Sequence, residues 1–161
     1  MALADFCRIL WRERELLELL LFKLEEEQLV LASGRARWLA HATREVEAVL
    51  DQIRDSERVR TLETDVVAME LGLAPGPSLI AIARTAPEPY AAMLLSHRDA
   101  FLTLTAEITE LAQANRRLLH EGMVGLSEAL AAVEEPAQTY GPAASRTLPR
   151  QSAGRLVDEA L

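Results

Sequence analysis

The chain has 161 residues, half of them apolar, but only two Trp, two Tyr and three Phe. Its 26 Ala and 28 Leu residues fill a third of the sequence. This excess of strong helix formers over β-branched and aromatic residues argues against a β-rich fold. With 25 acidic against 17 basic residues the net charge is -8, which weighs against nucleic-acid binding because phosphate contacts need surplus basic surface.

Proline divides the chain, because inside a helix it removes a hydrogen bond and clashes with the preceding turn. No proline occurs in residues 1–74 or 90–135, whereas prolines lie between these blocks and after the second. We expect residues 1–135 to form one helical-bundle domain. Residues 136–161 are rich in turn-forming and small residues, so we expect a flexible C-terminal tail.

The first block is too long for one packed helix, and Ser33-Gly34 offers a break because glycine is a good helix C-cap. Apolar residues on both sides of the break follow steps of three, four and seven, which favours lateral helix packing. Before the break they are Leu3, Phe6, Leu10, Leu17, Leu20, Leu24 and Leu31, and after it Leu39, Ala42, Val46, Val49, Ile53, Leu62, Val66 and Met69. We expect two antiparallel helices, with Trp38 and Phe101 in the core.

Residues 71–77 contain two glycines and two prolines and predict a turn, followed by a short helix or apolar plug at 78–84. A third long helix should run from about Pro87 to Glu134, with a packing seam along its length. That seam comprises Tyr90, Leu94, His97, Phe101, Leu104, Ile108, Leu111 and Leu118. The predicted fold class is all-α: three long antiparallel helices in a coiled-coil-like bundle, a short linking helix and the tail.

The third helix would be about 70 Å long at ~1.5 Å per residue, longer than either of the first two. Apolar residues continue to its end, at Leu118, Leu119, Met123, Leu126, Leu130 and Val133. If the other helices end before this level, these residues have no partner in the chain, and exposed apolar stripes usually mark binding surfaces. The alternative is that the tail folds back over them.

No catalytic or metal-binding motif is evident. None of the three histidines follows a glutamate at the Glu-x-x-His spacing of helical di-iron proteins. His120-Glu121 is followed by Val124, where a zinc-protease helix has its second histidine. Glu25–Glu27 are consecutive and would point in different directions around a helix, so they do not converge on a substrate. We interpret His97 as a buried, hydrogen-bonded core histidine and Cys7 as a small core residue, and expect no enzyme, metal or cofactor.

The most apolar window, residues 16–22, contains Glu18 and is far shorter than the roughly 20 residues of a membrane span. Charged residues interrupt the first fifteen positions, which is not typical of a secretory signal. Arginines are interleaved with acids throughout, a pattern that indicates surface ion pairs on helices. We therefore expect a cytoplasmic protein without membrane insertion and without a nucleic-acid partner.

The stretch from Leu20 to Trp38, LLFKLEEEQLVLASGRARW, followed by the segment 44–53, resembles the FlgN-type flagellar export chaperones. A second match is Ala114-Asn-Arg-Arg-Leu-Leu119, followed further along the chain by Tyr140-Gly141. The resemblance spans nearly the whole chain. Leucine-rich helices look alike, so the order of the matches carries more weight than any single one.

This resemblance implies a cytosolic, enzymatically inert helical protein that binds the C-terminal helical region of hook-filament junction (hook-associated) proteins. Such chaperones prevent premature assembly of these clients and deliver them to the export gate and ATPase components of the flagellar type III apparatus. The implied client-binding surface, in a helix-in-groove mode, comprises Leu118, Leu119, Met123, Leu126 and Leu130. The family's tail tyrosine is associated with export-gate docking, and Tyr140 is the matching residue.

A second hypothesis is a structural coiled-coil or helical scaffold protein that uses the same seams for homo-oligomerisation. A scaffold should keep regular heptads to its ends, whereas glycines and a proline-rich tail interrupt them here. No residue distinguishes a third class, a regulatory helical module such as an anti-sigma factor. A large, regular homo-oligomer that ignores junction proteins would favour the scaffold.

Overall fold

The computed structural model describes residues 2–134, which contain helices and no strands. The elements are α1 (Ala2–Ala32), α2 (Ala36–Leu71), α3 (Leu79–Thr85) and α4 (Tyr90–Glu134). The all-α prediction is confirmed, the short segment is a helix, and the third long helix begins at Tyr90 and not near Pro87. Residues 1–124 form one compact unit, and the second unit begins at Gly125 within α4. The predicted tail at 136–161 lies outside the described residues.

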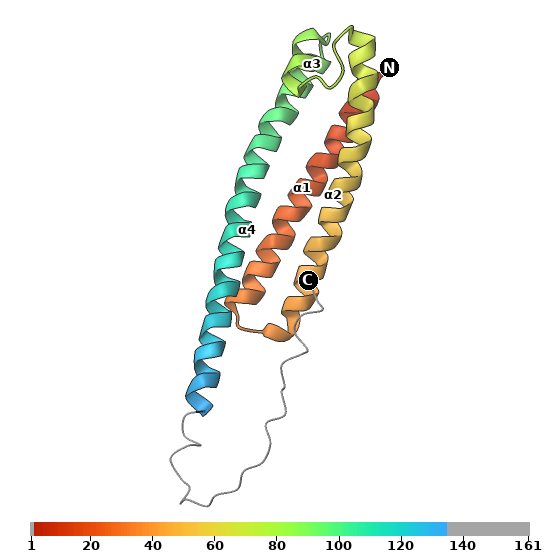
Figure 1. Cartoon of the computed structure of the whole chain (residues 1–161). Helices are drawn as coiled ribbons and strands as arrows, with labels where there is room; N and C mark the ends of the chain where they lie inside the picture. The colour runs from red at the N-terminus through yellow and green to blue at the C-terminus, as the bar shows by residue number, and fades with distance from the viewer. Residues whose placement is uncertain (1, 135–161) are drawn as a thin grey trace, which may run out of the picture. The chain divides into compact units, whose positions relative to one another are not determined.

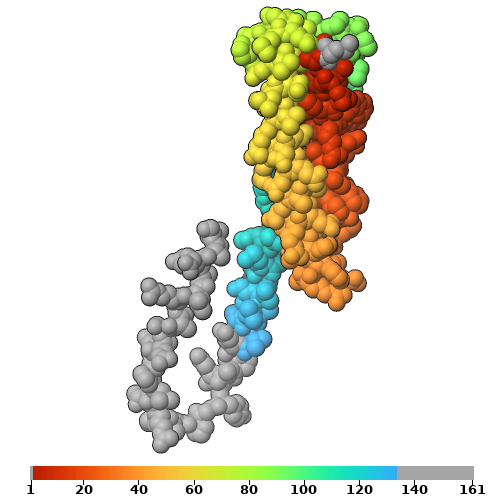
Figure 2. Space-filling view, turned by 90° about the vertical axis from the view of Figure 1, so that its right-hand side faces the viewer, coloured from red at the N-terminus to blue at the C-terminus, as the bar shows by residue number. Residues whose placement is uncertain are grey.

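The first unit is a bundle of the three long helices. α1 and α2 lie side by side and antiparallel, and α4 returns along the bundle in the same direction as α1 (Figure 1). In both views α3 lies at the end where α1 begins, close to the last turns of α2 (Figure 1, Figure 2). Successive long helices therefore alternate in direction, as the predicted turns require.

Glycine and serine define the helix ends. Gly34 and Gly72 have φ values of 66°, in the left-handed region that glycine adopts without steric cost. The N–H of Gly72 donates to the carbonyl oxygen of Met69 at 3.3 Å, which closes the end of α2. Ser78 caps α3, because its hydroxyl oxygen accepts a hydrogen bond from the N–H of Ala81 at 3.3 Å.

Two apolar clusters form the core. The first cluster joins the start of α1 to the end of α2, to α3 and to the start of α4. Its buried members are Ala2, Leu3, Phe6, Cys7, Leu10, Val67, Ile82, Ala83 and Leu94. The second cluster joins the later part of α1 to the first half of α2, and residues of α4 pack against it. Its buried members are Leu16, Leu20, Leu24, Val46, Val49 and Ile53.

The predicted seam of α2 is right in its first half and wrong in its second. Leu62 and Met69 are 70% and 74% exposed, whereas Val67 and Ala68 are buried. Steps of four and three from Ile53 lead through polar residues to Val67, so the buried face continues without apolar side chains in the middle. After this polar stretch, the residues that were predicted to pack therefore lie on a different face of α2 from the residues that are buried.

Trp38 is half-exposed, so its predicted place in the core is wrong. It lies in the first turn of α2, and the guanidinium of Arg37 lies 5.1 Å from the centre of its ring. A cation–π contact of this kind suits an exposed aromatic ring. Phe101, in contrast, is partly buried and packs against the first cluster, as predicted.

An ion pair between buried Glu13 and half-exposed Arg60 lies between the two clusters. Glu13 is buried, and Oε2 of its carboxylate lies 2.8 Å from Nε of Arg60 on α2. Burial raises the pKa of Glu13, and the charge of Arg60 partly opposes that shift. Removing one partner of such a pair leaves an uncompensated charge, so the pair holds α1 and α2 in register at this level.

His97 is buried as predicted, but Nδ1 of its ring has no hydrogen-bond partner among the described residues. Instead the ring lies edge-on to Trp11, with 4.8 Å between centroids, and stacks on Phe101 at 6.1 Å. Burial lowers the pKa of His97, and the nearby charge of Arg14 lowers it further. The folded protein therefore favours the neutral imidazole.

We expect the stability of the protein to fall as the pH drops from 7 to 5, partly through His97. Unfolding lets the imidazole take up a proton near its ordinary pKa of about 6.5, so acid favours the unfolded chain. His97→Phe should remove the contribution of His97 to the pH dependence of the free energy of unfolding. Urea unfolding at each pH measures this free energy. If the free energy of unfolding changes with pH equally in the wild type and in His97→Phe, the role given to His97 is wrong.

Candidate functional site

A groove lies where α1, α2 and the middle of α4 come together, within residues 20–119. Its volume is about 420 Å³. Most of the residues that line it are apolar. They are Leu20, Leu24, Glu27, Leu31, Val46, Leu50, Ile108, Thr109, Ala112, Gln113, Asn115, Arg116 and Leu119. Leu119 also belongs to the predicted client-binding set, so one member of that set lines the groove.

Asn115 is the buried polar residue of this groove, with only 4% of its surface exposed. Its Nδ2 donates to the carbonyl oxygen of Leu24 at 2.9 Å and to Oε2 of Glu27 at 3.1 Å. The other oxygen of Glu27 accepts a hydrogen bond from Thr43 on α2 at 2.8 Å. Asn115, Glu27 and Thr43 therefore connect all three long helices at this level.

The oxygen of the Asn115 amide, Oδ1, is buried and has no hydrogen-bond partner among the described residues. The amide cannot turn over to relieve this, because Oδ1 would then face two acceptors, the Leu24 carbonyl and the Glu27 carboxylate. A buried acceptor without a donor destabilises the folded state by about 1–3 kcal/mol. The groove therefore contains an acceptor of fixed direction whose hydrogen-bonding capacity is unused.

We expect Asn115→Leu to raise the free energy of unfolding by about 1–2 kcal/mol, because it replaces an unsatisfied amide with apolar surface. The cost of the lost bonds is small: the Leu24 carbonyl lies inside α1, and Glu27 is half-buried and keeps the bond from Thr43 on Oε1 while Oε2 loses the bond from Asn115. Urea unfolding of the two proteins measures the difference. A loss of more than about 1 kcal/mol would instead show that the bonds from Nδ2 dominate.

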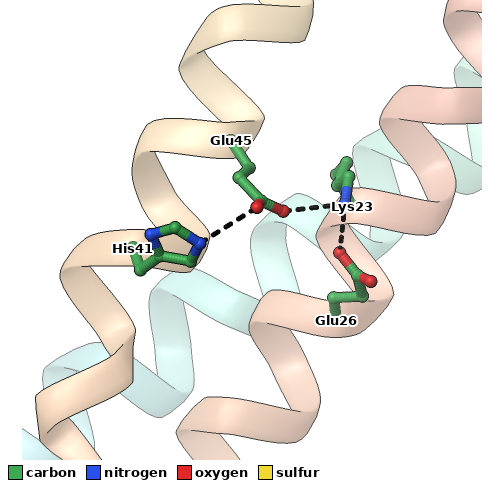
Figure 3. Close-up of polar contacts among 4 residues, drawn as sticks. All are labelled: Lys23, Glu26, His41 and Glu45. Carbon is green, nitrogen blue, oxygen red and sulfur yellow. Dashed lines mark hydrogen bonds and ion pairs between the residues drawn. The ribbon is translucent and has the colours of Figure 1, made fainter.

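Charged residues beside the groove tie α1 to α2. Figure 3 shows Glu45 of α2 between Lys23 of α1 and His41. Nζ of Lys23 lies 2.7 Å from Oε2 of Glu45 and 2.7 Å from Oε2 of Glu26. His41 Nε2 lies 3.1 Å from the other Glu45 oxygen. The hydrogen bond from Lys23 lowers the pKa of Glu45, and its two carboxylate partners raise the pKa of Lys23. Both groups are therefore charged at neutral pH.

The predicted client-binding residues differ in exposure. Leu118 is half-buried, while Leu119 and Met123 are 41% and 66% exposed. In the second unit, where α4 continues from Gly125 to Glu134, Leu126 and Leu130 are 61% and 58% exposed. Large apolar side chains this exposed have surface available to a partner. Tyr140, the predicted docking residue, lies outside the described residues.

The exposed apolar residues do not continue the seam that packs α4 in the bundle. Steps of four and three from Leu118 lead to Gly122, Gly125 and Ala129, which offer little side chain. The large residues follow another line along α4, which starts on the wall of the groove. Within the first unit that line is Ile108, Ala112, Asn115, Leu119 and Met123.

From the sequence, Asn115 was noted only within the Ala114–Leu119 family match and was given no role, although a further signal for it exists. The expected seam passed from Leu111 directly to Leu118, and the step of four from Leu111 is Asn115. A polar residue at a seam position fixes helix register at some loss of stability, so it indicates a structural or binding role. The groove itself depends on the relative heights of three helices, which no local pattern encodes.

Other kinds of site have no support in the part of the chain that the structure describes. Residues 2–134 contain no cluster of three or more His, Cys, Asp or Glu side chains that could hold a metal ion. Within the same residues, no helix combines the length and the apolar character needed to cross a membrane.

Comparison with known protein families identifies the chain. The family model described as FlgN protein matches residues 1–147. This chain belongs to the FlgN family. Neither the curated proteins nor the solved structures contain a significant match.

The FlgN family consists of chaperones of flagellar export and not of enzymes. Its members bind flagellar substrate proteins. The resemblance that the sequence indicated is thereby confirmed, and with it a role in flagellum biogenesis and protein export. For a FlgN protein, the relevant feature is a surface that holds another polypeptide.

Proposed function

We propose that this FlgN protein acts in the cytoplasm as a type III export chaperone for hook-filament junction (hook-associated) proteins. It binds the C-terminal helical region of a client, prevents premature assembly of that client, and delivers it to the export gate and ATPase components. The client-binding residues are Leu118, Leu119, Met123, Leu126 and Leu130. The protein performs no catalysis itself.

The observation that carries this proposal is the exposure of large apolar side chains on α4 from Leu119 onward. An amphipathic client helix would cover them with its own apolar face in the helix-in-groove mode. Burial of apolar area favours binding by about 25 cal/mol per Å², and the ordering of flexible segments offsets much of this gain. Moderate, reversible affinity is the expected result, which suits a chaperone that must release its client.

Co-purification tests the proposal most directly. The full chain should retain a hook-filament junction protein in a complex of defined size and should not retain that protein once its C-terminal helical region is deleted. A large, regular homo-oligomer that ignores junction proteins would instead indicate the structural scaffold. Failure to retain any junction protein would refute the proposed function.

Tyr140→Ala should impair export of the client while leaving its capture intact, if Tyr140 docks the loaded chaperone on the export gate. Aromatic residues are common anchors for a binding partner. Secreted junction protein, measured with and without the substitution, gives the export result. Loss of client capture by Tyr140→Ala would place this residue in the client-binding surface instead.

A further inference from the structure

We propose that the groove between α1, α2 and α4 seats part of the client helix, and that Asn115 selects a client with a hydrogen-bond donor in its apolar stripe. The donor would be an Asn, Gln, Ser or Thr side chain that reaches Oδ1 of Asn115. This inference rests on the proposed function and assigns Asn115 as a residue that determines specificity.

The groove has the chemistry of a seat for apolar side chains with one polar partner. A volume of about 420 Å³ falls in the range of ligand-binding sites and suits a few side chains of a helix. Its wall is largely leucine, valine and isoleucine, which favours an apolar stripe on the occupant. The two charged residues that line it, Glu27 and Arg116, have opposite signs, so the groove does not select a strongly charged ligand.

The orientation of the Asn115 amide determines which hydrogen-bonding group a client would need. Its side chain is almost completely buried, yet Oδ1 has no partner within the described residues. The two bonds from Nδ2 hold the amide in one orientation, in which the unused group is an acceptor with almost no exposed surface. A client donor therefore reaches Oδ1 only by displacing the side chains that cover it. A client donor would satisfy this acceptor, whereas a client carboxylate or carbonyl would leave two acceptors opposed. Sites built around a buried polar group discriminate strongly against ligands that lack the complementary group.

The position of Asn115 on α4 favours the client helix as the occupant. Asn115 lies one turn before Leu119 on the line of residues that leaves the groove wall and continues through Met123. A helix that covers Leu119 and Met123 can therefore place an earlier or later turn against Asn115. The groove and the exposed residues then act as one binding surface of α4.

The first test compares Asn115→Leu with the wild type. The probe is a synthetic peptide that comprises the C-terminal helical region of a hook-filament junction protein, and its affinity is measured by fluorescence anisotropy. We expect Asn115→Leu to bind this peptide about tenfold more weakly and to remain folded without loss of stability. Equal affinity of both proteins would overturn the proposal.

A double-mutant cycle identifies the donor. Each Asn, Gln, Ser or Thr in the apolar stripe of the peptide is changed to Ala, one at a time. One of these changes should weaken binding to the wild type about tenfold and to Asn115→Leu less than twofold. If no polar position in the peptide shows this coupling, Oδ1 does not select the client, and the inference is wrong.

Thr43→Val provides the matched control for the structural role of the network. It removes the hydrogen bond to Glu27 but leaves Asn115 and its two bonds in place. We expect its affinity for the peptide to stay within twofold of the wild type. If Thr43→Val weakens binding as much as Asn115→Leu, the network acts only by holding the helices together, which overturns the selective role.

The same measurements separate this inference from the proposed function. If the wild type does not bind the peptide, the proposed function fails and the inference fails with it. If the wild type binds but Asn115→Leu changes only self-association, the groove belongs to a contact between copies of this chain. In that case the chaperone function stands, and the role of Asn115 in client selection is refuted.

Discussion

Replacing Leu119 and Met123 together by aspartate should weaken capture of a junction protein at least about 100-fold, or ~2.7 kcal/mol. Leu119 is 41% and Met123 66% exposed, and neither belongs to the two buried clusters, so the bundle loses little of its own core. The client helix would instead have to cover two carboxylates without partners, and burying an unpaired charge is strongly unfavourable. Affinity for the C-terminal client peptide measures the effect, and circular dichroism checks that the variant is folded.

A matched control is available on α2. Leu62 and Met69 are even more exposed, and changing both to aspartate adds the same two charges to the same residue types. They belong to α2 and are not part of the proposed surface, so we expect affinity within twofold of the wild type. Equal losses in both variants would indicate a general effect of negative charge. Full binding by the Leu119 and Met123 variant would eliminate the proposed client surface.

Leu94→Ala should lower the free energy of unfolding by about 3 kcal/mol, within the 2–5 kcal/mol typical of buried leucines. Leu94 is 0% exposed and belongs to the first cluster, where α4 meets α1 and α3. Truncation removes apolar contacts and leaves a cavity that rigid helices fill poorly. This is a large fraction of the 5–15 kcal/mol that stabilises a typical domain.

The neighbouring residue supplies the control. Leu95 is 43% exposed, and Leu95→Ala should change the free energy of unfolding by less than about 1 kcal/mol. Both variants make the same chemical change in the same helix, so the difference reports burial alone. Similar losses for Leu94→Ala and Leu95→Ala in urea unfolding would contradict the assigned packing face of α4.

The number and limits of the helices could be predicted from single residue types. Gly34, Gly72 and the prolines at 75–89 act on the local backbone, and the structure places helix ends at these positions. The core faces of α1 and α4 could also be predicted, because their apolar residues recur without long gaps. Leu94 and His97, for example, are buried as the spacing requires.

The second half of α2 could not be assigned from periodicity, because its buried face is polar where Arg60 pairs with Glu13. A pattern of apolar residues does not reveal a charged residue that faces another helix because it forms an ion pair with that helix. Trp38 was misplaced for a related reason. It was predicted to lie in the core, whereas its location in the first turn after Gly34 leaves half of its surface exposed.

The candidate site was only partly accessible from the sequence. Leu119 and Met123 were chosen because apolar residues continue along α4, and their exposure makes them available to a client. Asn115 was missed, since its importance depends on the backbone carbonyl of Leu24 and the carboxylate of Glu27, far away in the sequence. The selection that we propose for it depends on this tertiary arrangement and not on a motif.

The ion pair of Glu13 and Arg60 has a consequence for the dynamics of the bundle. Because charged groups interrupt the apolar core, the two clusters lack the continuous packing that would make them melt as a single cooperative block. Amide protons around the second cluster, beside the groove, should then exchange through partial opening while those around Phe6 and Val67 stay protected. A client helix could enter while the second cluster is partly open, and the first cluster would stay folded.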